Sequence, residues 1–159
     1  MKKIWIIVLV FLFAWLIVFG AVYTAFYFGL RIERLDALTN FGKTVDGVVA
    51  AKQPEQHRTI IYYYDVDGIH YTGIGSGGNG NLDFDDLQIG DKVIVKYDEL
   101  YPLDSYMGLP QYKAQADRGL AYTASFIISL VLVGKALGIY LIVRQIRRSR
   151  STSTIRPVA

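Results

Sequence analysis

The feature that most constrains this chain is a long run without charge near its N-terminus. Residues 4–30, from Ile4 to Leu30, are 27 consecutive positions without Asp, Glu, Lys or Arg. A helix rises about 1.5 Å per residue, so this run extends roughly 40 Å, against a ~30 Å hydrocarbon core of a bilayer. The run therefore predicts a transmembrane helix that crosses with tilt.

The start of the chain resembles a secretory signal peptide, because Lys2 and Lys3 precede the apolar run. The apolar part of a signal peptide has about 7–15 residues and ends at a small-x-small cleavage site. This run is much longer. We therefore expect an uncleaved anchor, with residues 1–3 as a short cytoplasmic N-terminus.

A second apolar run occupies residues 119–143 and contains one charged residue, Lys135. A cluster of arginines follows it, as is typical of a stop-transfer segment: Arg144, Arg147, Arg148 and Arg150. We expect a second transmembrane helix over 119–143. Residues 144–159 are then a basic cytoplasmic tail that lies on anionic lipid and is largely disordered.

Charge is strongly segregated along the chain. All 14 acidic residues lie between Glu33 and Asp117, and near the predicted spans seven Lys or Arg lie at the termini against five on the loop side. This bias favours cytoplasmic termini and an extracytoplasmic segment 31–118. Six of the terminal cations are predicted to set topology and to contact lipid: Lys2, Lys3, Arg144, Arg147, Arg148 and Arg150.

The charge of the middle segment differs from that of the whole chain. Residues 31–118 contain nine basic and fourteen acidic residues, a formal charge of −5, although the whole chain carries +3. A nucleic-acid-binding domain would instead place its positive charge on the folded surface, so we exclude nucleic acid as a partner.

The chain has no cysteine, which excludes disulfides, thiolate zinc sites and cysteine nucleophiles.

The clearest strand signal is a hairpin between His57 and Ile74. Apolar residues alternate along its first strand, at Ile60, Tyr62, Tyr64 and Val66. Asp67-Gly68 then supplies a two-residue turn that tolerates positive φ. Pairing across this turn predicts one apolar face, with Val66 opposite Ile69, Tyr64 opposite Tyr71 and Tyr62 opposite Gly73.

On the other face of the hairpin, Asp65 is predicted opposite His70, and Tyr63 opposite Thr72. A carboxylate–imidazole pair can do acid–base chemistry. We favour the simpler interpretation, a solvated cross-strand pair.

Two further strands are predicted, over 44–52 and 92–97, the second after a Gly90-Asp91 turn. Residues 102–117 are expected to return irregularly to the membrane and to end in the helical turn that starts the second span. The predicted fold is an α+β membrane protein, with two transmembrane helices flanking a small, mainly antiparallel β domain, either a sheet or a partly open barrel. About 88 residues leave too little area for a deep substrate cleft, which favours binding over catalysis.

The order of three motifs resembles a known family. They are Gly47-Val48-Val49, Tyr64-x-Val66-Asp67-Gly68 followed by Tyr71, and Gly90-Asp91-Lys92-Val93 running to Tyr97-Asp98. Over about residues 42–106 this pattern resembles the bacterial membrane proteins grouped as domain of unknown function 3592. After Asp98 the chain departs from the family's usual Asp-Pro. The resemblance implies a β domain between apolar helices, in the inner membrane of a bacterium, and brings no catalytic residues.

A glycine-rich segment, from Gly75 to Gly80, satisfies G-x-G-x-x-G, but no helix is predicted after it to receive a pyrophosphate. A flexible loop is the favoured interpretation. The acidic residues that follow form a possible weak cation site, since Asp83, Asp85 and Asp86 offer hard oxygen ligands for calcium. A solvated acidic turn is the favoured alternative, and we predict no metal or cofactor site.

Catalytic groups are scarce in this sequence. The only histidines are His57 and His70, and Ser76 and Ser105 lie in turn-like surroundings without a nucleophile elbow. We therefore predict that the protein is not an enzyme.

The second span contains a close-approach motif, Gly134-x-x-x-Gly138, with Lys135 beside it. A Lys ammonium group inside the membrane costs about 2.5–3.5 kcal/mol on insertion scales. Such a residue is therefore retained where the ammonium has a partner, is hydrated, or reaches the membrane surface along its own side chain. Gly134, Lys135 and Gly138 are therefore candidates for helix packing. The motif either packs on the first span, near Ala14 or Ala21-x-x-x-Ala25, or contacts a membrane protein partner or a second copy.

Three functions remain from these observations. The first is a non-enzymatic integral membrane protein that acts as an interaction or accessory subunit of a cell-envelope assembly. The alternative is a membrane immunity or inhibitor protein, whose acidic outer domain neutralises a toxin or enzyme. Its charge of −5 would steer a basic partner toward it. The last of them is a membrane hydrolase or calcium sensor, which would depend on His70 or on Asp83, Asp85 and Asp86.

Overall fold

The computed structural model describes residues 2–153 in backbone, with side chains from Trp5 to Ser149 except Ile7. The chain divides into two compact units. One, the helical unit, contains the chain up to Phe26 and from Ala121. The other, the β unit, runs from Tyr27 to Leu120. Lys2, Lys3 and Arg150 were predicted to set topology and to contact lipid, but their side chains lie outside those that the structure describes.

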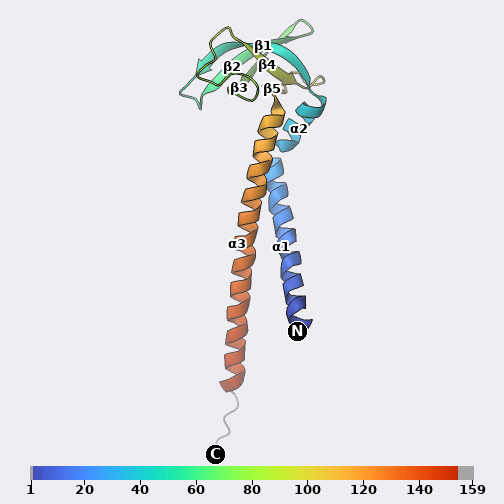
Figure 1. The fold of residues 1–159 in the computed structure, drawn as a ribbon, viewed down its shortest axis with the longest axis vertical. Coiled ribbons are helices and arrows are strands. Elements are labelled where there is room, and N and C mark those ends of the chain that lie inside the picture. The colour runs from blue at the N-terminus through green and yellow to red at the C-terminus, as the bar shows by residue number, and fades with distance from the viewer. Residues whose placement is uncertain (1, 154–159) are drawn as a thin grey trace, which may run out of the picture. The chain divides into compact units, whose positions relative to one another are not determined.

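The helical unit contains most of two long helices, α1 (Lys2–Gly29) and α3 (Pro110–Ser153). The first part of α3, up to Leu120, lies in the β unit. By length and composition, Val8–Gly29 and Pro110–Ser149 contain windows apolar enough to cross a membrane. The α1 and α3 helices run antiparallel (Figure 1). The prediction of an apolar helix at each end is thus confirmed, while membrane insertion stays a prediction.

Helix α3 is longer at both ends than the span expected over 119–143. It begins at Pro110. Proline suits the first helical position because its φ is fixed near the helical value, and because an N–H at this position would have no partner within the helix. The irregular segment is therefore shorter than expected, because all of residues 110–117 are helical where one helical turn was expected. Predicted disorder is wrong for 144–153, since Arg and Gln propagate a helix readily.

Aromatic side chains join α1 to α3. Trp15 contacts Phe126 edge-on at 5.8 Å between ring centroids, and Phe19 contacts Tyr122 at 5.5 Å. Three small residues of α3, spaced by four, are fully buried: Ala121, Ser125 and Ser129. Small residues at such a spacing let two helices approach closely.

The β unit contains a helix and five strands: α2 (Ile32–Phe41), β1 (Lys43–Gln53), β2 (Thr59–Val66), β3 (Ile69–Gly75), β4 (Lys92–Tyr97) and β5 (Ser105–Met107). The strands form one antiparallel sheet in the order β3-β2-β1-β4-β5, curled into a half-barrel (Figure 1). This confirms the predicted α+β class with an antiparallel sheet.

The β2–β3 hairpin has the predicted register at every pair, including Tyr64 with Tyr71 and Asp65 with His70. Its turn residues adopt positive φ, 52° at Asp67 and 79° at Gly68. The turn geometry matches the right-handed twist of the strands and so fixes the pairing.

The curl of the sheet originates in the central strand β1. Its first half, up to Val48, pairs with β4, and its second half, from Gly47, pairs with β2, with a bulge between Val49 and Ala51. At the overlap, a side chain on Gly47 would collide with Val95. The offset pairing, the bulge and the bare glycine together let β1 bend.

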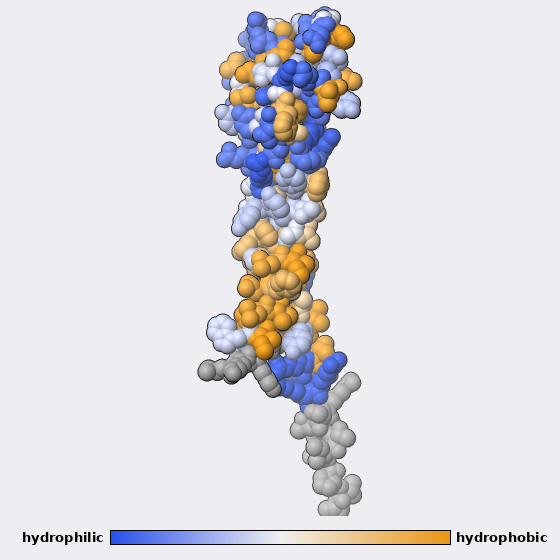
Figure 2. Space-filling view, turned by 90° about the vertical axis from the view of Figure 1, so that its right-hand side faces the viewer, coloured by the Kyte–Doolittle hydropathy of each residue, from blue (hydrophilic) through white to orange (hydrophobic). Residues whose placement is uncertain are grey.

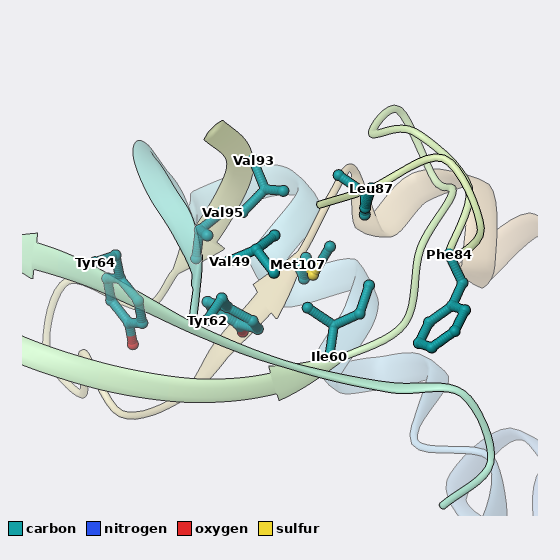
Figure 3. Packing of buried hydrophobic residues seen from close by; sticks show 9 residues of the cluster. All are labelled: Val49, Ile60, Tyr62, Tyr64, Phe84, Leu87, Val93, Val95 and Met107. Carbon is teal, nitrogen blue, oxygen red and sulfur yellow. The ribbon is translucent and has the colours of Figure 1, made fainter. Parts of the chain in front are cut away.

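The core fills the concave face of the sheet (Figure 3). It consists of Val49, Ile60, Tyr62, Tyr64, Phe84, Leu87, Val93, Val95 and Met107. Ile60, Tyr62 and Tyr64 were predicted from strand alternation, and Val49, Val93 and Val95 lie in the two further strands that were predicted. Phe84 and Leu87 were not predicted, because they come from the loop between β3 and β4, and Met107 was not, because it lies in the unpredicted strand β5.

Helix α2 was not predicted. A left-handed residue, Arg31 with φ of 55°, separates it from α1. Its buried residues Ile32, Leu35 and Leu38 recur every three positions, which is the signal that could have revealed it. Asp36, on the same helix, accepts a hydrogen bond from the Tyr27 hydroxyl at 3.1 Å and pairs with Arg118.

Candidate interaction surface

The loop between β4 and β5, residues 98–104, is closed by its own backbone. The Asp98 carboxylate accepts the N–H groups of Leu100 and Tyr101, at 2.8 and 3.2 Å. The Asp98 N–H donates to the Asp104 carbonyl at 2.9 Å, and the Asp104 N–H donates to the Tyr101 carbonyl at 2.7 Å. These bonds form a compact turn, which we call the 98–104 loop.

Side chains from β2 and α2 hold this loop in place. The Tyr64 hydroxyl donates to the Pro102 carbonyl, and the Tyr62 hydroxyl shares a 3.0 Å hydrogen bond with Ser105. Arg34 pairs with the Asp104 carboxylate and donates to the Ser105 carbonyl at 2.9 Å. The 98–104 loop is thereby joined to two elements far from it in the chain.

Burial raises the pKa of Tyr62 and of Tyr64 above the ordinary value of a phenol. It also raises the pKa of Tyr106 to about 12, with the Asp117 carboxylate adding to the effect. A protonated phenol can donate, as Tyr64 does to Pro102.

The loop presents apolar side chains to solvent. Leu100 is 82% exposed, Tyr101 72% and Leu103 76%. Phe41, at the end of α2, is 84% exposed. An ion pair of 2.5 Å between Lys43 and Glu99 ties the start of β1, just after Phe41, to this loop. We call Phe41, Leu100, Tyr101 and Leu103 the apolar patch.

Such a patch is typical of an interaction site. Exposed apolar groups on a monomer mark protein or membrane contacts when they gather on one surface. Here the backbone beneath them is fixed by hydrogen bonds, so little ordering entropy opposes binding. Nothing in the sequence pattern predicted this patch, because the residues of the 98–104 loop follow no strand or helix period.

The glycine-rich segment, predicted as a flexible loop, is instead ordered by two asparagines. Asn81 accepts the Ile94 N–H at 2.7 Å and donates to the Ile94 carbonyl at 3.1 Å. Asn79 donates to the Tyr106 hydroxyl at 2.9 Å, and its carbonyl accepts the Leu109 N–H at 2.6 Å. The segment therefore packs along β4 and β5.

The acidic residues of that loop do not converge. Asp85 pairs with Arg58 at 2.6 Å, and the Arg58 guanidinium lies over the Phe84 ring, 4.9 Å from its centroid. Asp83 and Asp86 are exposed. Among the residues that the structure describes, no group of three or more His, Cys, Asp or Glu side chains could hold a metal ion.

The Asp65 carboxylate and the His70 imidazole contact each other across β2 and β3, and both side chains are more than half exposed. The solvated cross-strand pair is therefore the interpretation that the geometry favours.

The predicted packing residues of α3 do not contact α1 closely. Gly134, Lys135 and Gly138 are exposed, and a Cβ built on either glycine would have no neighbour within 4 Å. Of the two alternatives for this motif, close packing on Ala14, Ala21 or Ala25 finds no support in these distances, and the buried small residues of α3 are Ala121, Ser125 and Ser129. Gly134 lines an open apolar groove of about 510 Å³ with Trp15, Phe126 and their neighbours. Contact with a partner stays a prediction.

Three of the predicted topology residues share one cavity. Arg144, Arg147 and Arg148 line a space of about 480 Å³ together with Tyr140 and Val143. Figure 2 shows the hydrophobic side chains of the helices giving way to hydrophilic ones at this end of α3.

No family model matches this chain, and neither a curated protein nor a solved structure does. The resemblance to the domain of unknown function 3592 family is therefore still a prediction.

Proposed function

We propose that this protein is a two-pass integral membrane protein whose β unit binds a protein partner through the apolar patch. It would act as an interaction or accessory subunit of a cell-envelope assembly, without enzymatic activity. The observation that carries the proposal is the exposure of Leu100, Tyr101 and Leu103 on a loop fixed by Arg34, Tyr62 and Tyr64. A fixed apolar surface loses little entropy on binding.

The proposed location is the inner membrane of a bacterium, with both termini cytoplasmic and the β unit outside. Two apolar helices and the positive charge at the chain ends support it. The resemblance to the domain of unknown function 3592 family supports the bacterial setting.

Topology can be tested directly because the chain has no cysteine. Thr72→Cys should react with a membrane-impermeant maleimide on intact spheroplasts. Ser149→Cys should react only after the membrane is opened. The reverse pattern would overturn the proposed orientation, and labelling of both residues without opening would overturn two-pass insertion.

Partner binding can be tested by placing a photo-crosslinking amino acid at Tyr101 in the full chain, in its native membrane. A matched variant carries the same group at Ile89, which is also exposed but lies in another loop. We expect one discrete crosslinked protein from position 101, absent from position 89 and lost on Leu100→Asp/Leu103→Asp. Equal crosslinking from both positions would overturn the patch as the binding site.

The inhibitor alternative is favoured by the formal charge of −5 over residues 31–118. It predicts that the partner is basic and that binding falls steeply as salt increases. A complex through the apolar patch should change little between low and high salt. Measuring crosslink yield against salt concentration separates the two functions.

A further inference from the structure

Strand β3 lies at one edge of the sheet and pairs with β2. The two strands meet at a two-residue turn, with Val66 opposite Ile69. In such a hairpin the residues that flank the turn are hydrogen-bonded to each other. Every second residue after them then points its N–H and C=O away from the partner strand. His70, Thr72 and Ile74 therefore point their backbone groups out of the sheet.

The pairing of β1 gives the same alternation independently. The Val49 N–H donates to the Asp91 carbonyl at 2.9 Å, on the side of β1 that faces β4. Successive residues of a strand point to opposite neighbours, so Val48 points toward β2, where it lies opposite Tyr63. Tyr63 thus uses its backbone groups on β1. Thr72, which lies opposite Tyr63 on the other side, is left with its own N–H and C=O facing outward.

This edge carries none of the usual protection against further pairing. In the part of the chain that the structure describes, no other segment bonds to the outward groups of His70, Thr72 or Ile74. Residues 69–75 contain no Lys, Arg or Pro, and β2 and β3 pair without a bulge. Such residues and bulges are what ordinarily prevent an edge from pairing. The opposite edge is the three-residue strand β5, whose shortness itself resists pairing.

The two ends of β3 differ in how much room they leave for another strand. A Cβ on Gly75 would lie 2.7 Å from the Met107 Cβ, so this end of β3 lies against β5. At the hairpin end, a Cβ on Gly68 would have no neighbour within 4 Å, and Ile69 is exposed. The accessible part of the edge is therefore the half nearer the turn.

We propose that β3 pairs with β3 of a second copy of this chain, antiparallel, about a two-fold axis at Tyr71. His70 of each copy then lies opposite Thr72 of the other, and the outward N–H and C=O groups of both residues are hydrogen-bonded. Tyr71 lies opposite Tyr71 of the second copy. This central pair is not hydrogen-bonded, and at such pairs the side chains approach most closely.

The side chains that meet in this pairing favour a second copy as the occupant. Tyr71 stacks on Tyr64 with 5.7 Å between ring centroids, so the symmetric contact brings together two stacks of phenols that already exist. No like charges lie opposite each other, and the Asp65 carboxylate contacts the His70 imidazole within each copy. A two-fold contact also closes both edges at once. It does not rest on the partner proposed for the apolar patch.

Disulfide formation between copies tests this pairing, and the absence of cysteine from the chain makes the test specific. Tyr71→Cys is introduced into the full chain in its native membrane. Opposite Cα atoms of a pair without hydrogen bonds lie about 4.5 Å apart, within the range that a disulfide spans. The matched control is Ile74→Cys, at a highly exposed position of the same strand. In the proposed register it lies roughly 20 Å from its own counterpart.

We expect a disulfide-linked dimer from Tyr71→Cys and little from Ile74→Cys. Equal yields would indicate random collision and would overturn the contact, as would the absence of a dimer from both variants. A linked product of any other mass would mean that a strand of another protein lies on this edge. That result would overturn the second copy as the occupant.

A second pair of variants tests the backbone groups without a cysteine. Thr72→Pro removes an N–H that points out of the sheet, and proline is tolerated at such an edge position. The symmetric contact loses two hydrogen bonds, so the Kd of the dimer should increase at least about tenfold. Thr72→Ala keeps the N–H and should keep the dimer. Native mass spectrometry in mild detergent measures the dimer, and circular dichroism checks folding. A dimer that Thr72→Pro leaves unchanged would overturn the proposal.

Discussion

Arg34 is a single side chain that connects α2 to the 98–104 loop, 70 residues further along the chain. Its guanidinium uses two different nitrogens, one on the Asp104 carboxylate and one on the Ser105 carbonyl. A lysine cannot make this fork. The position of the loop therefore depends on the shape of the cation as well as on its charge.

Arg34→Lys should lower the free energy of unfolding of the β unit by roughly 1–2 kcal/mol, a modest value because both partners are partly exposed. The midpoint of urea unfolding in detergent, followed by circular dichroism, measures this. Lys43→Arg is a matched control, since the Lys43–Glu99 pair is more exposed. An equal loss in both variants would contradict a specific role for the Arg34 fork.

Gly73 has no side chain because the Tyr62 ring occupies the space that one would need. Gly73→Ala should force the ring aside, weaken its hydrogen bond to Ser105 and destabilise the β unit by roughly 1–3 kcal/mol. The neighbouring Thr72→Ala, on the opposite face of β3, should change stability little. Thermal unfolding of both variants checks this, and a stable Gly73→Ala protein would show that the ring can move freely.

The elements of the sheet differ in how far the sequence predicts them. Local signals were sufficient for the β2–β3 hairpin, where alternation and the Asp67-Gly68 turn specify the register. Strand β5 has three residues, which are too few to show an alternation of apolar and polar side chains. It forms a strand through its backbone pairing with β4. Phe84 and Leu87 are buried through contacts distant in sequence, which no local pattern records.

The same limit applies to the candidate sites. The exposed Asp65–His70 pair follows from the hairpin register, and the arginine cluster is evident from composition. The apolar patch depends on the Arg34–Asp104 and Tyr64–Pro102 links, each between segments far apart in the chain. The Gly134-x-x-x-Gly138 motif is typical of close packing, but the small residues of α3 that are fully buried are Ala121, Ser125 and Ser129.

Asn81 extends the pairing of β4 beyond the end of β5, because its side-chain amide mimics a backbone peptide toward Ile94. Asn81→Ala should remove both bonds and lower the unfolding free energy by roughly 1–3 kcal/mol. Hydrogen exchange at the Ile94 amide should become faster. Unchanged exchange would mean that another group protects this amide.

On the scale of the whole molecule, the two units differ in how their stability depends on pH. The β unit contains Tyr62, Tyr64 and Tyr106, whose pKa values are raised in the folded state. Unfolding returns each phenol to a pKa near 10. The unfolded state therefore loses protons first, and stability that is fully present below about pH 10 is lost as the pH rises toward 12.

We therefore expect the β unit to unfold between about pH 10 and 12 while the helical signal persists. Near-ultraviolet circular dichroism should report the loss of tyrosine packing, and far-ultraviolet circular dichroism should report the helices. Tyr106→Phe should shift the transition to higher pH, because it removes the phenol with the largest change. A transition that this variant leaves in place would contradict the role of Tyr106.

The amide of Asn81 also bears on how copies of this protein behave when they are crowded together. A sheet that stops at a three-residue strand leaves the next strand's N–H and C=O groups open, and open edges recruit strands from neighbouring molecules. Asn81 occupies the Ile94 groups where β5 ends. We expect this side chain, together with the Gly108 N–H that also donates to the Ile94 carbonyl at 2.7 Å, to hinder strand pairing between molecules at this end of β4.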